Sequence, residues 1–448
     1  MKSKTTRGQL HPQARSLVEC LREFLTPALW KQVNGQRHSA RRSPRWSTQP
    51  LVFTLLLMTW CCGDSQAERF ETAKAHCALC LTKRRRPGQT VQGFQKALAK
   101  LPMPVLRQVG AGIRKLLGTR LATRWFYDGF IPFGCDGTRV NCPRTVELEK
   151  RLGEAGKEGS APSIWITAIV HLRLGLPWCW QIGKGTASER SHLLQMVKML
   201  PAMAILVADA GYFGFGLTQQ LLERKVVFLL RMSSNVKLYT QEDVLMEEFE
   251  EGLVHYFPSE KEKQEKPLLL RLIRVRGKDG NDVWLLTSVL ERERLSVACA
   301  GRFYRWRWEN EGQFRAYKET LGKVKMVSRT VRLIHREAEG SLLGMQLMLA
   351  QGALAMKPCK DRAKEPVCSP RKILLAIREA MKGPPSRGRA KFSERLRQAV
   401  RERRERTSAK SSRPWVRRKP HKPPKPPQLL KLTEEQKALI SRMEMTAA

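Results

Sequence analysis

Short apolar segments of strand length alternate with amphipathic segments of helical length between residues 130 and 232, and this alternation restricts the fold more than any other feature. The expected order is three strands, a helix, a strand, a helix and a strand, and Ser188 is the expected N-cap of the first helix. Strands and helices mixed in this order predict an α/β core. The segments are FIPFGCDGTRV, SIWITAIVHLR, LPWCWQIGKG, SERSHLLQMVKML, AILVADAGYFG, FGLTQQLLERK and KVVFLLRMS.

Two aspartates follow apolar strands of this core. Asp136 ends the first expected strand, and Asp209 ends the fourth, shortly before Gly211. If the first and fourth strands are neighbours in the sheet, the two carboxylates lie side by side. An acid at a strand end before a glycine is also a common turn residue. Each aspartate alone is therefore open to both interpretations.

A third acid belongs to the segment YRWRWENEGQFRAYK. Tyr304, Arg307, Glu311 and Lys318 follow one another at spacings of three, four and seven residues. These spacings are close to whole helical turns, so one long helix would carry all four side chains along one stripe. The alternative is a solvated helix face on which Glu311 and Arg315 form an ordinary i,i+4 pair.

The three acids together favour a metal site over three unrelated surface carboxylates. Unpaired carboxylates in one cleft repel each other unless cations neutralise them. Mg²⁺ suits carboxylate sites that leave positions open for phosphate and water. Two such ions can activate an attacking oxygen and stabilise a leaving oxygen in phosphodiester displacement.

At these residues a family resemblance becomes specific. DGTRV around Asp136, DAGYFG around Asp209, and the tyrosine, arginine, glutamate and lysine (YREK) signature of residues 304–318 resemble the DDE transposases of the insertion sequence four family. The resemblance covers roughly residues 20 to 360. It implies a ribonuclease-H-like catalytic core with a β-rich insertion, working on DNA with Mg²⁺, or Mn²⁺ as a substitute, and with two ions per site.

The resemblance also implies a role for each site residue. Asp136, Asp209 and Glu311 would be the catalytic metal ligands. The DNA-binding residues would be Tyr304, Arg307 and Lys318, which would hold phosphates near the transposon end, and Trp284, which matches the place where a relative stacks an aromatic ring on a flipped base. A buried strand tryptophan is an equally open interpretation of Trp284.

The whole chain is expected to contain an α/β core between a helical domain and a disordered tail. Residues 1–125 carry helical apolar spacing interrupted by basic stretches, which suits an α-helical DNA-binding domain. Residues 126–232 would form the first part of the core, residues 233–283 the β-rich insertion, and residues 284–360 the second part with C-terminal helices. Residues 361–448 are expected to form a basic, Pro-rich, largely disordered tail.

The charge of the chain predicts a polyanionic partner. The 448 residues include 82 lysines and arginines against 41 acids, a net charge of +41. A ribosomal or membrane-surface protein would share this charge, but 42% hydrophobic residues indicate a large core. The apolar run LVFTLLLMTWCC is shorter than the roughly 20 residues that span a bilayer and is expected to form a buried helix. No membrane association is expected, and the expected location is the bacterial cytoplasm, at the nucleoid.

Cysteine usage agrees with a reducing compartment. Eleven cysteines at irregular spacing argue for reduced, mostly buried thiols rather than a disulfide framework. His76, Cys77 and Cys80, with Cys61 and Cys62 upstream, could supply zinc ligands, but a second well-spaced pair is missing.

The leading functional hypothesis is a cut-and-paste transposase. It would bind double-stranded DNA, namely the terminal inverted repeats of its element and the target, as a homodimer or a larger paired-end assembly. Water would cut at the transposon end, and the freed 3′ hydroxyl would attack the other strand or the target. The alternatives are a catalytically inactive DNA-binding derivative and a ribonuclease-H-like nuclease without strand transfer.

Overall fold

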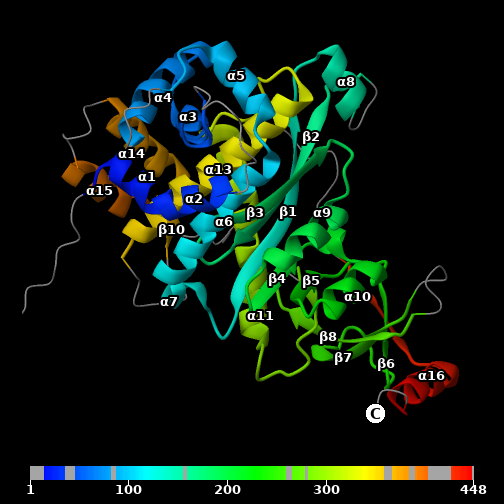
Figure 1. Cartoon of the computed structure of the whole chain (residues 1–448). Helices are drawn as coiled ribbons and strands as arrows, with labels where there is room; N and C mark the ends of the chain where they lie inside the picture. The colour runs from blue at the N-terminus through cyan, green and yellow to red at the C-terminus, as the bar shows by residue number, and fades with distance from the viewer. Residues whose placement is uncertain are drawn as a thin grey trace, which may run out of the picture. The chain divides into compact units, whose positions relative to one another are not determined.

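The chain divides into two compact units (Figure 1). The helical unit comprises residues 1–121 and 316–402, and the sheet unit comprises residues 122–315 and 403–448. The computed structural model describes residues 15–35, 46–81, 87–154, 159–258, 265–277, 281–357, 366–382, 389–401 and 425–445.

The helical unit joins two segments that are far apart in the sequence. Its first segment ends near the expected boundary at residue 125, but the chain enters the unit again at residue 316. Its elements are α1 (Leu17–Phe24), α2 (Pro27–Gly35), α3 (Thr48–Trp60), α4 (Gln66–Cys80), α5 (Val91–Lys100), α6 (Met103–Arg120), the π-helix Ala316–Thr320, α13 (Val331–Ala355), β10 (Val367–Cys368), α14 (Pro370–Lys382), α15 (Arg389–Arg397) and β11 (Val400–Arg401).

Helices α3 and α13 form the centre of this unit. Helix α3 is apolar on all sides and almost entirely buried, as expected for the run LVFTLLLMTW. Two glycines let α13 approach it closely: a Cβ atom at Gly340 would lie 2.5 Å from Leu55 Cδ2, and one at Gly344 would lie 3.1 Å from Thr59 Cγ2. The Trp60 indole N–H also donates to the carbonyl of Gly344 at 3.2 Å. This helix is expected from the sequence to pack against the α/β core as one of the C-terminal helices of residues 284–360, whereas it packs against α3 and α6 of the helical unit.

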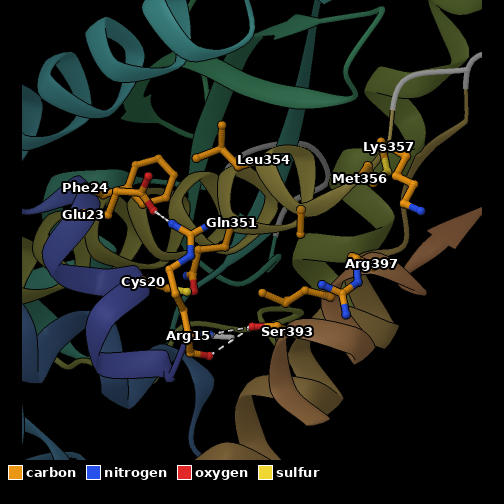
Figure 2. A pocket seen from close by; sticks show the side chains of 12 residues that line it. Arg15, Cys20, Glu23, Phe24, Gln351, Leu354, Met356, Lys357, Ser393 and Arg397 are labelled. Carbon is orange, nitrogen blue, oxygen red and sulfur yellow. Dashed lines mark hydrogen bonds and ion pairs between the residues drawn. The ribbon is translucent and has the colours of Figure 1, made fainter. Parts of the chain in front are cut away.

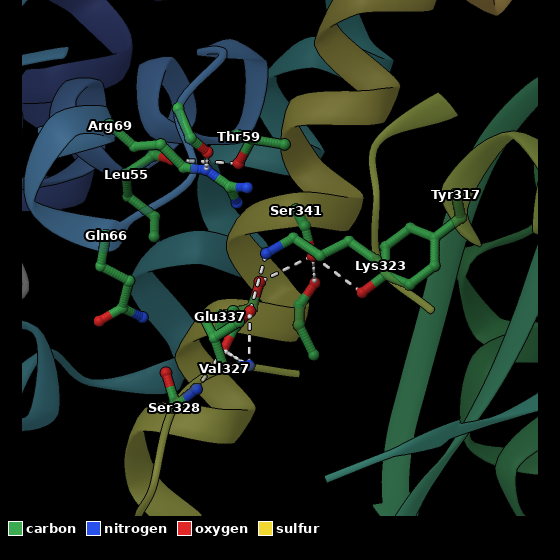
Figure 3. A network of polar contacts seen from close by, with 12 residues as sticks. Leu55, Thr59, Gln66, Arg69, Tyr317, Lys323, Val327, Ser328, Glu337 and Ser341 are labelled. Atoms are coloured by element: carbon green, nitrogen blue, oxygen red, sulfur yellow. Dashed lines mark hydrogen bonds and ion pairs between the residues drawn. The ribbon is translucent and has the colours of Figure 1, made fainter. Parts of the chain in front are cut away.

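A buried ion pair holds the start of α13 (Figure 3). Lys323 Nζ lies 2.7 Å from Glu337 Oε1, and both side chains are about 10% exposed. The backbone N–H groups of Val327 and Ser328 also donate to this carboxylate, at 3.1 and 2.9 Å to Oε2. Burial alone would raise the pKa of Glu337, but Lys323 and these N–H groups together lower it.

The helical unit also contains a cavity of ≈ 250 Å³ (Figure 2). Arg15, which pairs with Glu23, and Gln351 line it together with Ser393 and Arg397. None of its described lining residues belongs to the predicted site.

The expectation of a largely disordered tail is wrong for much of residues 361–448. Helix α14 buries Ile373, Leu374, Ile377 and Met381, whose spacing of one, three and four residues makes an apolar face. Strand β10 pairs with β11, and residues 428–445 form a strand and a helix of the sheet unit. The basic stretch at residues 402–424 lies outside the described residues.

The sheet unit is built on one ten-stranded sheet, and the expected mixed α/β architecture is confirmed. The strands follow the order β12-β6-β7-β8-β9-β5-β4-β1-β2-β3. The elements are α7 (Ala122–Trp125), β1 (Ile131–Asn141), α8 (Val146–Leu152), β2 (Ser163–His171), β3 (Leu176–Lys184), α9 (Glu189–Met196), β4 (Ala204–Ala208), α10 (Phe215–Glu223), β5 (Val227–Arg231), β6 (Lys237–Thr240), β7 (Glu251–Tyr256), β8 (Leu268–Val275), β9 (Val283–Thr287), α11 (Val297–Trp306), α12 (Trp308–Arg315), β12 (Gln428–Lys431) and α16 (Glu434–Met445), with short 3-10 turns at Val197–Met199 and Ala210–Tyr212.

Strand direction divides the sheet into a mixed half and an antiparallel half. Strands β1, β4 and β5 are parallel to one another, while β2 and β3 follow β1 antiparallel. Strands β6, β7 and β8, which lie in the expected insertion at residues 233–283, pair antiparallel and join β5 through β9. The expected insertion therefore extends the same sheet as the core. Strand β12 adds to the edge of β6 in parallel.

Helix α11 covers one face of the parallel strands. Its Ala300 and Phe303 share a buried apolar cluster with Ile205 and Val207 of β4 and with Leu229 of β5. Alternate residues of a strand point to opposite faces, so these odd-numbered positions of β4 and β5 all face α11. The same alternation decides to which face of the sheet the side chains after each strand point.

The described cysteines and helices agree with the expected burial. Of the described cysteines, which are all free, Cys62 is exposed and the others are buried. Within the described stretches, no helix combines the length and the apolar character needed to cross a membrane.

Candidate active site

The pairing register brings the two predicted aspartates together. The last β1 and β4 partners are Gly134 and Val207, so two further residues along each strand lead to Asp136 and Asp209. The first and fourth strands of the core are neighbours in the sheet, which is the condition under which the two aspartates lie side by side. Asp136, however, is not at a strand end, because β1 continues to Asn141 in its pairing with β2. The first strand simply extends past its parallel neighbour.

Both aspartates face the same side of the sheet. Asp209 follows the α11-facing residues Ile205 and Val207 at the next odd position. Gly134 faces α12, since a Cβ atom there would lie 2.6 Å from Asn310 Nδ2, and Asp136 has the same parity. The site therefore lies where the parallel strands meet the helices α11 and α12.

Asp209 accepts contacts from three directions. Its Oδ1 accepts a hydrogen bond from the backbone N–H of Ala210 at 2.9 Å. The guanidinium of Arg231 lies 3.3 Å from Oδ1, and Arg307 Nη2 lies 3.5 Å from Oδ2. The Asp209 side chain is still 39% exposed, so one side of the carboxylate is open to a ligand.

Asp136 is the more buried of the two acids. Burial raises its pKa, and the nearby charge of Asp209 raises it further. The Gly137 N–H, which donates to Asp136 Oδ1 at 2.8 Å, and the Arg307 guanidinium oppose this shift without cancelling it. The neighbouring cation and hydrogen-bond donor therefore do not fully compensate the negative charge of the Asp136 carboxylate.

The predicted single long helix is interrupted at Arg307. Helix α11 ends at Trp306, with Arg307 as its C-cap, and α12 begins at Trp308. The expectation that residues 304–318 form one uninterrupted stripe is therefore wrong. The interruption lets the Arg307 side chain, only 5% exposed, turn towards Asp209. Its guanidinium carbon also lies 5.4 Å from the ring centroid of Tyr304.

Tyr304 completes the wall of the site beside the cations. Its side chain is 9% exposed. Burial raises the pKa of its hydroxyl, and the charges of Arg307 and Arg231 oppose that shift. The hydroxyl thus stays a neutral hydrogen-bonding group over the ordinary pH range.

Glu311 lies in α12, four residues after Arg307, and its side chain is partly buried. The preceding Asn310 packs against Gly134 of β1, and Gln313 donates from Nε2 to the carbonyl of Gly175 at 2.7 Å. These contacts fix α12 against β1 and the β2–β3 turn. Even so, no group of three or more His, Cys, Asp or Glu among the described residues is arranged to hold a metal ion.

The donor set nevertheless fits a hard divalent cation. Asp136 and Asp209 are neighbouring carboxylates that repel each other, and the only charges opposing them in the described geometry are guanidinium groups at 3.3–3.5 Å from Asp209. Carboxylate oxygens are the ligands that Mg²⁺ prefers. Glu311 lies on α12, the helix that packs against β1, but it forms no three-acid metal-binding group with them in the described part of the chain.

The remaining two predicted residues have different surroundings. Trp284 in β9 is 5% exposed, and the guanidinium of Arg274 lies 5.2 Å from its ring centroid. A DNA base could stack on this indole only after the Arg274 side chain moves. Lys318 lies in the π-helix of the helical unit, and burial lowers its pKa.

Two further residues near the aspartates, Arg231 and Glu189, are not among the predicted site residues. Arg231 ends β5. Ala208 of β4 pairs with Leu230 of β5, so the next residues along the two strands, Asp209 and Arg231, lie beside each other. Glu189 begins α9, and burial together with Asp136 raises its pKa. The strand pattern contained a signal for Arg231, because side chains that follow adjacent parallel strands meet at one sheet edge. Nothing in the sequence pattern singles out Glu189.

Comparisons with known proteins concern the segment that carries the aspartates and Glu311. Residues 135–344 match the family model of the transposase DDE domain, a range that contains Asp136, Asp209 and Glu311. No curated protein matches the chain. Among solved structures, the piggyBac transposase synaptic complex with hairpin DNA is similar at 13% sequence identity and a TM-score of 0.37, covering 84% of this chain and 78% of its own. An overlap of that size carries no argument. The family match supports a DDE transposase.

Proposed function

We propose that this chain is a cut-and-paste DNA transposase of the insertion sequence four type, with the YREK signature at residues 304–318. One observation carries the proposal: the register of β1 and β4 places Asp136 beside Asp209, inside the segment that matches the transposase DDE domain. Two neighbouring acids at a partly open sheet edge fit metal-dependent phosphodiester chemistry.

The order of the strands supports a ribonuclease-H-like core. Strands β1, β2 and β3 form an antiparallel meander, and β4 and β5 then add in parallel on the other side of β1. In this arrangement the two aspartates follow from neighbouring parallel strands, β1 and β4. The strands of the insertion extend the sheet beyond β9, away from β1.

In the proposed mechanism Asp136, Asp209 and Glu311 would hold Mg²⁺, or Mn²⁺ in its place, as two ions per site. Such ions would supply activation of the attacking water or 3′ hydroxyl and stabilisation of the leaving oxygen. The aspartates contribute the two fixed ligands, since their strands are paired. Glu311 contributes the third from α12, which Asn310 and Gln313 anchor to the sheet.

The cations of the site position the DNA. Arg307 and Arg231 already approach a carboxylate, and a guanidinium binds a phosphate with the same fork of N–H donors. Tyr304 supplies a neutral hydroxyl beside them, and Lys318 supplies a further phosphate contact. The net charge of +41 favours a DNA partner along the whole chain. The paired-end complex is a homodimer or larger, formed in the bacterial cytoplasm at the nucleoid.

Cleavage of the element's own ends tests the proposal. The substrate is DNA from both sides of the coding region, including any inverted repeats bracketed by a short target duplication. The unaltered chain should cut it with Mg²⁺ or Mn²⁺ and not with a chelator, and Glu311→Gln should not cut it. Equal cleavage by Glu311→Gln would overturn the assigned site.

Two outcomes would favour the alternative functions. Specific binding of the ends without cleavage under any divalent metal would indicate an inactive DNA-binding derivative. Cleavage without joining would indicate a nuclease, and a strand-transfer assay into plasmid DNA separates this outcome from transposition.

A further inference from the structure

We infer that Arg231 has two alternative partners, the Asp209 carboxylate and a DNA phosphate, and that its ion pair with Asp209 makes metal binding depend on bound DNA. The inference rests on the proposed function and deepens it, because it names a regulation of the same site. It starts from the end of β5, where Arg231 is the last residue and lies beside Asp209.

Both carboxylate oxygens of Asp209 face guanidinium groups. Oδ1 accepts the backbone N–H of Ala210 at 2.9 Å and Arg231 Nη1 at 3.3 Å, and Oδ2 lies 3.5 Å from Arg307 Nη2. A carboxylate oxygen has about two lone-pair sites, so the two donors at Oδ1 use both of them. Oδ1 therefore becomes available to a divalent cation only when one of these donors withdraws.

The two arginines differ in how firmly they are held. Arg307 is 5% exposed, and its guanidinium carbon lies 5.4 Å from the ring centroid of Tyr304 and 5.3 Å from that of Trp308. The Arg231 side chain is 30% exposed and lies beside Asp209 and the Tyr304 hydroxyl. It can turn towards solvent while its backbone stays paired with β9. Arg231 is therefore the cation that can change partner.

A DNA phosphate is the anion that would take Arg231 from Asp209. A guanidinium binds a phosphate with the same fork of N–H donors that it offers to a carboxylate. The Asp209 side chain is 39% exposed, so a phosphate can reach the pair from the solvent side. Once Arg231 has turned to the phosphate, Asp209 Oδ1 keeps only the Ala210 N–H, and the positive charge beside the carboxylate falls by one.

This exchange makes the binding of DNA and the binding of a divalent cation support each other. The affinity of Asp209 for the cation rises when DNA is bound, and by linkage the cation raises the affinity for DNA by the same factor. Within the described stretches no three acids are arranged to hold a metal, and an Asp209 held by two arginines agrees with a site that is completed only with DNA. Phosphodiester chemistry is then limited to the DNA-bound chain.

Binding of Mn²⁺ to the full chain without DNA tests the competition between Arg231 and the cation. The dissociation constant, measured by electron paramagnetic resonance of free Mn²⁺, should fall roughly 10-fold in Arg231→Met, since a neighbouring cation changes the affinity of a carboxylate for a proton by about that factor or more. Arg231→Lys keeps the charge and should stay close to the unaltered chain. Arg224→Met, at an exposed arginine whose guanidinium donates to the carbonyl of Leu194, is the matched control and should not change the constant. A variant that fails to fold cannot produce a tighter metal site.

Binding of DNA in the presence of a chelator tests the phosphate partner without turnover. The probe is a labelled duplex from either side of the coding region, and fluorescence anisotropy gives its affinity at several salt concentrations. In Arg231→Met the slope of log affinity against log salt should become less steep by about 0.9, the value of one phosphate contact on duplex DNA. An unchanged slope would mean that Arg231 does not bind a phosphate.

The results that overturn the inference differ from the result that overturns the proposed function. An unchanged or higher Mn²⁺ dissociation constant in Arg231→Met would overturn the inference, and equal tightening in Arg231→Lys would contradict the role of its charge. If Asp209→Asn and Glu311→Gln still weaken Mn²⁺ binding in either case, the transposase proposal stands. If neither Asp209→Asn nor Glu311→Gln changes Mn²⁺ binding, the metal site of the proposed function is itself wrong.

Discussion

Glu337 in the helical unit is a buried carboxylate and Asp136 in the sheet unit a partly buried one, and their surroundings differ in kind. Glu337 has Lys323 at 2.7 Å and two backbone N–H donors, and its pKa is lowered. Asp136 has one backbone donor, a second acid nearby and a more distant guanidinium, and its pKa is raised. A fully paired buried charge maintains a fold, whereas an underpaired one is available for a ligand.

The largest expected effect separates activity from stability at Asp136. Asp136→Asn should reduce cleavage of the transposon ends by at least ~10³-fold, because a group that acts with the other metal ligands is lost. The melting temperature should stay the same or rise, since the neutral amide removes the repulsion with Asp209. Cleavage rate and thermal unfolding are measured on the same preparation.

Asp243→Asn, at an exposed acid of the sheet unit, serves as the control and should change neither quantity. A clear fall in melting temperature for Asp136→Asn would mean that Asp136, like Glu337, stabilises the fold, and the contrast between the two acids would be lost.

For Lys323, the partner of Glu337, we expect a substitution to lower the stability of the fold. Lys323→Met should destabilise the chain by roughly 3–5 kcal/mol, because it leaves the Glu337 carboxylate buried without its cation. Chemical denaturation measures the change. Lys74→Met, which breaks the pair of the partly buried Lys74 with the exposed Glu71 in the same unit, should have a much smaller effect. Equal effects of the two changes would show that burial does not distinguish these pairs.

The close approach of α3 and α13 should also contribute measurably to the free energy of unfolding. Gly340→Ala should cost roughly 1–3 kcal/mol, because the new methyl group would lie 2.5 Å from Leu55 and force the helices apart. Gly344→Ala should cost less, since the nearest atom, on Thr59, is 3.1 Å away. Denaturation midpoints of the two variants give the ranking, and a reversed order would contradict the described packing.

The smallest effect is the pH dependence of the Glu337 contribution. Its pKa is lower in the folded chain than in the unfolded chain, so the stabilisation is fully present above the ordinary glutamate value, 4.5, and is lost as the pH falls through the folded pKa. The unfolding free energies of the unaltered chain and Glu337→Gln should therefore converge as the pH is lowered from 7 to 3. A constant difference would exclude this linkage.

The adjacency of the two aspartates could be predicted in part, because the positions of strands along the chain and the alternation of their side chains are local properties of the sequence. The apolar segments before Asp136 and Asp209 indicate two buried strands, and neighbouring parallel strands bring the residues that follow them together. The same reasoning, applied to β5, would have found Arg231. Glu189 could not be found in this way, since its position depends on how α9 packs against Gly137.

The errors have a physical cause as well. Neither proline nor glycine marks the interruption at Arg307, where the arginine side chain contacts Asp209, a residue distant in the sequence. The expectation of a disordered tail rests on its composition, which is dominated by basic residues and proline. In α14 the apolar residues are few but lie on one face, and their position rather than their number decides burial.

The pairing of β12 with β6 has a consequence for the order of synthesis. Thr240 Oγ1 contacts the carbonyl of Leu430 across 190 residues of sequence. At roughly 5–20 residues per second, the ribosome needs on the order of 10–40 s to make the intervening chain. During that interval the outer edge of β6 has no strand from its own chain to pair with. An open strand edge is a template for pairing with other chains, so nascent copies on one message are the nearest partners that could occupy it.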